Sequence, residues 1–202
     1  GTRLHPYTKI LPKPLIPYGE KPIVEIIMDT FNQYGIEDFY ITLNHKGEIV
    51  KAYFDSIDIG YNLRFIMEND FLGTAGGLKC LPDDISNTFF VSNCDILVKA
   101  DYHDIFKYHC ENGNLLTIVG SLQHFIIPYG VIGFASDGVV NEITEKPEYD
   151  YTVNTGVYVM EKRILDFIPE DETIHATDLI KTLINEKERI GLYPVGEKSY
   201  ID

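Results

Sequence analysis

The chain has 202 residues, of which 45% are apolar and 24% are charged, as in ordinary globular domains. Its formal net charge of −14 argues against a nucleic-acid partner, because DNA and RNA are bound by neutralising phosphates with Lys and Arg. No stretch approaches the roughly 20 apolar residues of a membrane-spanning helix, and no signal-peptide pattern opens the chain, so we expect no membrane partner and a cytoplasmic location.

Helical and strand patterns alternate along the first half of the chain. Apolar residues recur at helical spacing in three segments, and short apolar runs rich in β-formers lie between them. We expect helices over residues 22–34, after Asn44 and after Asp101, and strands over residues 39–43, 63–67, 88–92 and 115–119. This order predicts βα units and a largely parallel sheet, with residues 39–43 as a buried strand.

The second half contains several strands with little helix between them, so some antiparallel pairing is expected there. We expect strands over residues 131–134, 139–143, 153–160 and 190–195, and a helix over residues 176–186. No internal repeat or linker interrupts the sequence. The predicted fold class is therefore α/β, a single Rossmann-like domain over residues 1–202 with a mixed, mostly parallel sheet flanked by helices.

The basic segment at the start is the first candidate site. Open α/β sheets bind ligands at the carboxyl ends of their strands, so we expect the site in the loops at those ends. Residues 1–21 hold four basic residues against the single acid Glu20, inside an acidic chain. Lys13 stands between Pro12 and Pro14, which stiffen its backbone and suit it to a phosphate contact. A proline-rich surface turn would explain the same residues.

Three further loops carry candidate residues. Residues 72–78 hold three glycines, which let a backbone approach a ligand closely, although a tight turn before a helix explains them equally well. Asp95 follows the strand at 88–92 and can hold Mg²⁺ there, although a turn aspartate is the plainer interpretation. Lys146 is stiffened by Pro147, and a surface ion pair with Glu145 is its alternative explanation.

The order of the motifs is more specific than any one of them. The chain reads Gly-Thr-Arg-Leu from residue 1, Pro-Lys-Pro-Leu from 12, Leu-Gly-Thr-Ala-Gly from 72, Asn-x-Asp from 93, Tyr-Gly-Val from 129, Glu-Lys-Pro from 145 and Asn-Thr-Gly from 154. From end to end it resembles the sugar-1-phosphate nucleotidyltransferase family, and most closely its mannose-1-phosphate guanylyltransferase-like branch. The resemblance implies transfer of a nucleotidyl group from a nucleoside triphosphate, GTP by the form of the glycine loop, to a sugar 1-phosphate, with release of pyrophosphate.

The resemblance also implies roles for individual residues. Arg3, Lys13 and Asp95 would be catalytic, and Asp95 and Asp202 would hold Mg²⁺. The nucleotide would bind Gly1, Thr2, Arg3, Lys13, Glu68, Gly73, Thr74, Ala75, Gly76 and Gly77. The sugar phosphate would bind Gly130, Glu145, Lys146, Asn154 and Thr155. The expected partners are thus a nucleoside triphosphate and a sugar 1-phosphate, and the sequence leaves a homo-oligomer open.

The chain departs from the family pattern in two places. The family has a strand and further glycines just before Gly-Thr-Arg, so we expect the chain to be truncated before Gly1 and also after Asp202. Cys94 replaces a glycine that often precedes the metal aspartate, which bears on how that turn bends. Two other functions stay open: a catalytically silent regulatory domain that binds nucleotide sugar, and a metal-dependent glycosyltransferase that uses one.

The cysteines and histidines suggest no further chemistry. Cys80, Cys94 and Cys110 share no CxxC spacing, so neither a zinc site nor a disulfide framework is expected. The six histidines form no metal-ligand spacing, and we interpret all of them as structural or surface residues.

Overall fold

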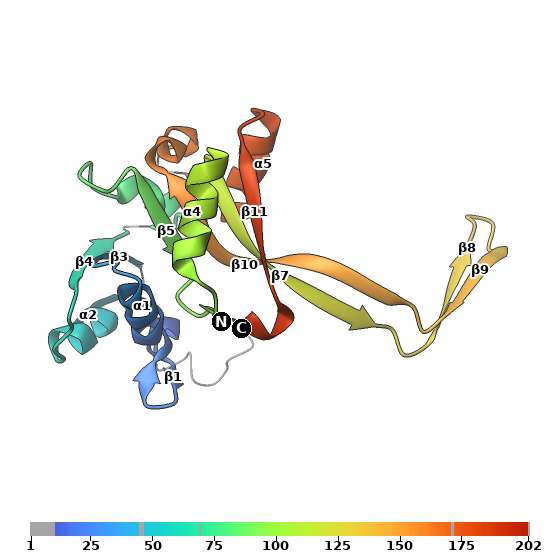
Figure 1. The fold of residues 1–202 in the computed structure, drawn as a ribbon, viewed down its shortest axis with the longest axis horizontal. Helices are drawn as coiled ribbons and strands as arrows, with labels where there is room; N and C mark the ends of the chain where they lie inside the picture. Colours follow the sequence, from blue (N-terminus) through green and yellow to red (C-terminus); the bar gives the residue numbers. More distant parts are fainter. Residues whose placement is uncertain (1–10, 45–46, 69, 171, 202) are drawn as a thin grey trace.

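The computed structural model describes residues 11–44, 47–68, 70–170 and 172–201. Its centre is a four-stranded sheet in the order β11-β7-β10-β5 (Figure 1). The strands are β5 (Thr88–Ser92), β7 (Leu116–Ile126), β10 (Glu148–Glu161) and β11 (Ile190–Val195). β10 runs antiparallel to β5 and β7, whereas β11 is parallel to β7. The antiparallel pairing expected in the second half is therefore confirmed.

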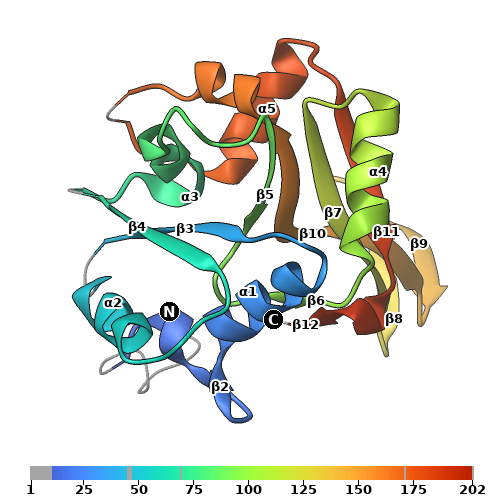
Figure 2. The same cartoon turned by 60° about the vertical axis from the view of Figure 1, so that its left-hand side comes forward.

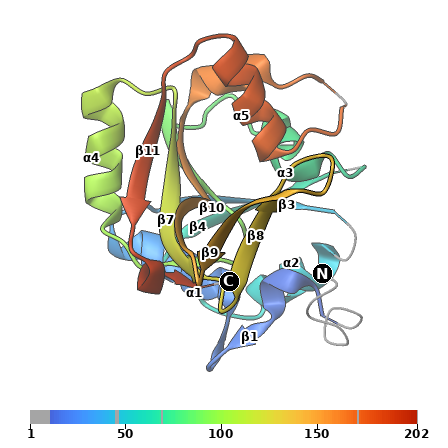
Figure 3. The same ribbon diagram turned by 90° about the vertical axis from the view of Figure 1, so that its right-hand side faces the viewer.

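Helices cover both faces of this sheet, because alternate residues of a strand point to opposite sides. Val157 and Val159 of β10 pack in one apolar cluster with α1 (Ile23–Gln33) and α4 (Tyr102–Asn112). Tyr158 and Met160 pack in another cluster with α5 (Ala176–Asn185). Figure 3 shows α4 and α5 on opposite faces of the sheet. The predicted α/β class, with a mixed sheet flanked by helices, is confirmed.

A second pair of parallel strands, β3 (Asp38–Leu43) and β4 (Asn62–Met67), lies beside the central sheet with α2 (Gly47–Asp55) (Figure 2). Among the described residues, β3 pairs only with β4 and β5 pairs only with β10. A cavity of about 760 Å³ lies between β3 and β5 and is lined by both. Residues 39–43 were expected to form a buried strand. Of the residues of β3, however, only Leu43 is buried, because the others face this cavity or solvent.

Local signals placed the helix ends correctly. α1 begins after Pro22 and is followed by Gly35 in the left-handed region at φ 84°. The side chain of Asp101 caps α4 by accepting hydrogen bonds from the backbone N–H groups of His103 and Asp104 at 3.0 and 3.1 Å. The helices expected after Asn44 and near residue 176 are α2 and α5.

Short elements complete the described chain: β1 (Pro17–Tyr18), β2 (Lys21–Pro22), β6 (Leu97–Val98), β12 (Tyr200–Ile201), α3 (Gly73–Gly76) and the 3₁₀ turns η3 (Lys13–Leu15), η4 (Gly77–Cys80), η5 (Lys162–Phe167) and η6 (Glu197–Ser199). In the part of the chain that the structure describes, no helix has both the length and the apolar content needed to cross a membrane.

The strands β7 and β10 continue beyond the sheet as a two-stranded ribbon, which we call the arm and define as residues 122–153. The hairpin of β8 (Gly130–Phe134) and β9 (Val140–Glu145) lies at its far end (Figure 1). Burial changes abruptly at its base, since Ser121 is fully buried and Leu122 is 50% exposed. The sequence predicted one strand that ends at residue 119 and another that begins at residue 153. Both bounds were wrong, because β7 and β10 extend into the arm.

Candidate functional site

An ion pair between Lys13 and Asp95 forms the centre of the candidate site. Lys13 opens η3, where Pro12 precedes it and Pro14 follows, and Asp95 comes three residues after the end of β5. Lys13 Nζ donates a hydrogen bond to Asp95 Oδ2 at 2.5 Å, which raises the pKa of the lysine. Both side chains are partly exposed, so the pair is open to a ligand from solvent. The fold thus brings together two of the predicted site residues that are 82 positions apart.

The end of the described chain lies beside Asp95. Ile201 of β12 pairs antiparallel with Leu97 of β6, two residues after Asp95. β5 and β11 also run in the same direction, because β10 is antiparallel to β5 and β7, and β11 is parallel to β7. Asp202 lies outside the described residues, as do Gly1, Thr2 and Arg3, so their roles stay predictions.

The glycine segment is a tightly packed turn of helix. A Cβ added at Gly73, whose φ is 84°, would lie 2.3 Å from the carbonyl oxygen of Ile174, and one at Gly77 would lie 2.2 Å from Oε1 of Glu68. The N–H groups of Ala75 and Gly76 donate to the Ile174 oxygen at 3.0 and 3.2 Å. Packing and backbone conformation therefore require glycine at Gly73. The structure also brings Glu68 and Gly77 together, two of the predicted nucleotide ligands.

Thr74 links this segment to α5, which the sequence reasoning missed. Its Oγ1 accepts a hydrogen bond from the backbone N–H of Ala176 at 2.9 Å, at the first turn of α5. The two residues are 102 positions apart, so no local sequence signal could have joined them. The cavity between β3 and β5 extends to this segment, since Gly73, Thr74, Ala75 and Gly77 also line it.

Asn93 positions the Asp95 loop against β10, and it too was missed. Its backbone N–H donates to the Gly156 oxygen at 3.1 Å, and its Nδ2 lies 2.4 Å from the place of a Cβ at Gly156, whose φ is 80°. Only glycine fits there, so the glycine of Asn-Thr-Gly was the available signal. Thr155 and Gly156 form the adjoining bulge in β10, between the paired residues Asn154 and Val157.

The polar side chains of this bulge are bonded within the protein. Thr155 is fully buried, and its Oγ1 donates to the Val119 oxygen at 2.7 Å. Asn154 donates from Nδ2 to the hydroxyl of Tyr158 at 2.7 Å and accepts from the N–H of Gly156 at 3.0 Å. Both residues therefore shape β10, and their contact with a sugar phosphate stays a prediction.

Gly130, Glu145 and Lys146 lie together, but on the arm. Gly130 pairs with Glu145 across the β8–β9 hairpin, and Glu145 Oε2 lies 3.1 Å from the place of a Cβ at Gly130. The N–H of Lys146 donates to the Tyr129 oxygen at 3.3 Å, and its φ of 47° is rare for a residue other than glycine. The structure thus separates the predicted sugar-phosphate ligands on the arm from the pair of Lys13 and Asp95.

Cys94 does not need the flexibility of the glycine it replaces. Among the described residues other than glycine, positive φ angles occur only at Lys146 and Lys187, so the turn before Asp95 uses backbone angles that cysteine adopts freely. Burial raises the pKa of the Cys94 thiol to about 11, with a further increase from the adjacent Asp95. The side chain is therefore a neutral apolar group at neutral pH.

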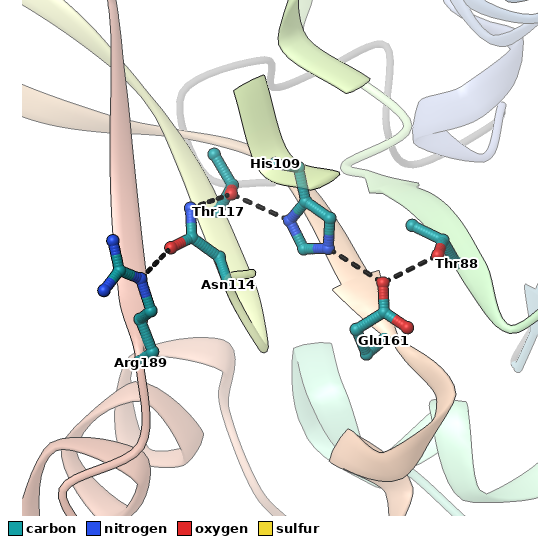
Figure 4. A network of polar contacts seen from close by, with 6 residues as sticks. All are labelled: Thr88, His109, Asn114, Thr117, Glu161 and Arg189. Carbon is teal, nitrogen blue, oxygen red and sulfur yellow. Dashed lines mark hydrogen bonds and ion pairs between the residues drawn. The ribbon is translucent and has the colours of Figure 1, made fainter. Parts of the chain in front are cut away.

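His109, the most buried of the described histidines, belongs to a structural network rather than to this site (Figure 4). His109 Nδ1 lies 2.8 Å from Thr117 Oγ1, and its Nε2 lies 3.1 Å from Glu161 Oε1, which also accepts from the Thr88 hydroxyl at 2.6 Å. The network connects α4 to β5, β7 and β10, which agrees with the structural role expected for this histidine.

Asp95 is suited to help hold a divalent cation. Mg²⁺ in nucleotide enzymes is held by one or two carboxylates and completes its shell with water and substrate phosphates. Among the described residues, no three His, Cys, Asp or Glu side chains gather as a metal site. The Lys13 ammonium on Asp95 shows that this carboxylate already accommodates a positive charge at close range.

Comparisons of the sequence with a family model and with curated proteins agree on one family. A family model described as nucleotidyl transferase matches residues 1–195. UTP–glucose-1-phosphate uridylyltransferase of Synechocystis is 30% identical over 85% of this chain and 49% of its own length. Mannose-1-phosphate guanyltransferase of Saccharomyces cerevisiae is 29% identical over 93% of this chain and 55% of its own length. The chain thus spans about half the length of the curated relatives it matches.

Solved structures show the same fold. HddC from Yersinia pseudotuberculosis superposes with a TM-score of 0.72 and 24% identity, over 95% of this chain and 84% of HddC. Its complex with GMP-PN gives a TM-score of 0.69. A putative glucose-1-phosphate thymidylyltransferase from Bacillus anthracis gives a TM-score of 0.71 at 19% identity, over 96% of this chain and 82% of that protein.

Proposed function

The chain belongs to the nucleotidyl transferase family, and from this we propose that the protein transfers a nucleotidyl group from a nucleoside triphosphate to a sugar 1-phosphate. The observation that carries the proposal is the ion pair of Lys13 and Asp95 at the carboxyl end of β5. This end of a strand is where open α/β sheets bind their ligands. When a nucleotide and its metal bind there, the ammonium group can contact the triphosphate and the carboxylate can contact the metal.

The chemistry requires positioning rather than a protein base. A phosphate oxygen of the sugar 1-phosphate attacks the α-phosphorus of the nucleotide, and the bond between that phosphorus and the oxygen bridging to the β-phosphate breaks. The electron pair of that bond leaves with pyrophosphate. The attacking oxygen is already anionic, so no proton has to be removed, and the protein's task is to align two anions and offset their charge.

Lys13 and Arg3 are proposed to bind the phosphates that become pyrophosphate. Lys13 is held by Asp95 at 2.5 Å, and a triphosphate would draw its ammonium away from the carboxylate. Asp95, with Asp202, would then be free to hold Mg²⁺. When bound, such a cation supplies electrostatic stabilisation of the charge on the phosphate oxygens. Lys146, with Glu145 and Gly130 beside it, is proposed to bind the sugar phosphate.

For the nucleotide we propose GTP, because the Leu-Gly-Thr-Ala-Gly form of residues 72–76 is typical of the guanylyltransferase branch. We also propose that residues 1–202 act as one catalytic domain and that it works in the cytoplasm, since the three cysteines are free thiols in the structure. Cell fractionation tests the location, and recovery with membranes would contradict it.

The decisive test measures pyrophosphate release by the whole protein with Mg²⁺, across GTP, UTP, dTTP and CTP and a series of sugar 1-phosphates. Release that requires both substrates supports the proposal, and fastest turnover with GTP supports the choice of nucleotide. Faster turnover with another nucleotide would contradict the choice of GTP alone. Tight binding of a nucleotide sugar without any turnover would instead identify a silent binding domain.

A further inference from the structure

We propose that Thr74 is a positioning residue for the nucleotide, because its side chain joins the glycine segment, residues 72–77, to the first turn of α5. The inference rests on the proposed function, in which the glycine segment binds the nucleotide. It starts from the hydrogen bonds between this segment and residues 172–176, which we call the brace. Figure 2 shows α3, the helical part of the segment, beside α5.

α5 receives its N-terminal cap from the glycine segment. The first N–H groups of a helix have no partner within the helix, and a side chain just before the helix usually bonds one of them. Within the described chain, His175 stands at this position, and its side chain makes no capping hydrogen bond. Thr74 supplies the cap instead, since its Oγ1 accepts from the Ala176 N–H at 2.9 Å. The Thr74 hydroxyl therefore sets the position of the segment relative to α5.

Backbone hydrogen bonds in both directions hold the same two segments together. Ile174 donates from its N–H to the Leu72 oxygen at 2.9 Å, and its own oxygen accepts from Ala75 and Gly76 at 3.0 and 3.2 Å. Gly73 packs so closely on that oxygen that a Cβ would lie 2.3 Å from it. The shape of the glycine segment therefore depends on the brace, which lies about 100 positions later in the chain.

These bonds decide what the segment can offer to a ligand. The N–H groups of Ala75 and Gly76 are bonded to Ile174, so they are not the groups that a nucleotide meets. The segment also lines the cavity beside β3, and the Glu68 carboxylate lies against Gly77. A nucleotide thus meets a surface whose position the brace determines, and a misplacement of about 1 Å in such a surface can cost on the order of a hundredfold in rate.

The place of α5 in the fold does not depend on Thr74. Leu179 and Leu183, on the apolar face of the helix, are buried in one cluster with Leu116 and Met160 of the central sheet. Burial of such side chains is the main contribution to stability, and it remains when the Thr74 hydroxyl is removed. Loss of the hydroxyl should therefore loosen only the first turn of α5 and the glycine segment.

Thr74→Val in the whole protein tests the proposal, because valine is close to threonine in shape but cannot accept from the Ala176 N–H. The KM for the nucleotide should rise roughly tenfold, the equivalent of one buried N–H left unbonded. kcat and the KM for the sugar 1-phosphate should stay within about twofold. Thr74→Ser keeps the acceptor and should restore the KM. An unchanged KM in Thr74→Val, or no recovery in Thr74→Ser, would overturn the proposal.

Thr182→Val is the matched control. Its hydroxyl donates to the Asp178 oxygen at 3.2 Å, on the same helix but away from the glycine segment. The variant loses a threonine hydrogen bond of α5 and should leave all three kinetic constants within about twofold of wild type. The same rise in nucleotide KM in this variant would overturn the proposal, because any loss of stability in α5 would then have that effect.

Amide exchange, followed residue by residue without substrates, separates positioning from direct contact with the nucleotide. In Thr74→Val, exchange should be roughly tenfold faster at Ala176, Ala75 and Gly76, and unchanged at Leu183 farther along α5. Unchanged exchange at Ala75 and Gly76 would overturn the proposal, because Thr74 would then act on the nucleotide without positioning the segment. Faster exchange in a protein whose wild type releases no pyrophosphate would contradict the proposed function instead.

Discussion

The two ends of β10 show how differently the body and the arm are stabilised. From Thr155 to Met160 every residue of the strand is buried between helices, whereas from Glu148 to Thr152 every residue is exposed. Both segments pair with β7 through the same kind of ladder. Backbone hydrogen bonds therefore extend a strand well beyond the core, but burial of side chains decides which part of it is held in place.

The largest effect is expected at Asp95 in the body. Asp95→Asn removes the charge that pairs with Lys13 and, in the proposed mechanism, a ligand of the cation. Metal stabilisation of a transition state is worth several kcal/mol, so turnover should fall on the order of a hundredfold or more. Pyrophosphate release with Mg²⁺ measures this, and thermal melting should change little. Asp202→Asn should behave alike, and near wild-type turnover in either variant would exclude that residue as a ligand.

A matched pair of core and arm substitutions should differ by several kcal/mol. Ile105→Ala, at a fully buried position of α4, should cost about 2–5 kcal/mol of unfolding free energy because it leaves a cavity. Ile143→Ala, 69% exposed on the arm, should cost less than about 0.5 kcal/mol in dilute protein. Urea unfolding at two protein concentrations measures both. Equal costs at both positions would contradict the distinction between body and arm.

The cavity between β3 and β5 has room for one more extended segment, because β3 and β5 each have an edge there without a strand partner among the described residues. We expect an extended segment added ahead of Gly1 to pair with both edges. Protein carrying such a segment should gain a few kcal/mol and melt on the order of 5–10 °C higher. Amide exchange in residues 39–42 and 89–92 should slow in the same sample. Unchanged exchange in both strands would contradict this placement.

A smaller and selective effect is expected at the arm's lysine. Lys146→Ala should weaken use of the sugar phosphate by roughly tenfold or more, the worth of one hydrogen bond to a charged group. Nucleotide affinity should stay within about threefold, because Lys146 follows the end of the β8–β9 hairpin on the arm, whereas Lys13 is bonded to Asp95 in the body. Nucleotide titration and sugar-phosphate kinetics separate the two. A large loss of nucleotide affinity would show that the lysine acts on the other substrate.

The smallest effect concerns pH. Burial of Glu25 opposes its ionisation, but hydrogen bonds from Lys21 and the Tyr53 hydroxyl outweigh this and lower its pKa. Its contribution, about 1–2 kcal/mol, should be present at neutral pH and lost as the pH falls through that lowered pKa. On the arm, Asp150 raises the pKa of His124, so that pair weakens as the pH rises. In urea unfolding, the stability of Glu25→Gln should converge with that of wild type as the pH falls below this lowered pKa, and a difference that stays constant with pH would contradict the assignment.

Much of the body could be predicted because its signals are local. The cap at Asp101, the stop at Gly35 and the strand at residues 190–195 depend on neighbours in the sequence, and each was found where expected. Lys13 and Asp95 were each named as site residues from the resemblance to a family, but the contact between them was found only in the structure.

Tertiary structure alone decided the rest. The sequence contains the apolar residues of the arm, but their exposure depends on where β7 and β10 leave the core, and this is set by packing with α4 and α5. The contacts of Thr74 with Ala176 and of Asn93 with Gly156 join residues far apart in the chain. The sequence therefore determined which residues are available for phosphate and sugar chemistry. The fold decided that they lie in two separate places, because the length of an extended ribbon keeps them apart.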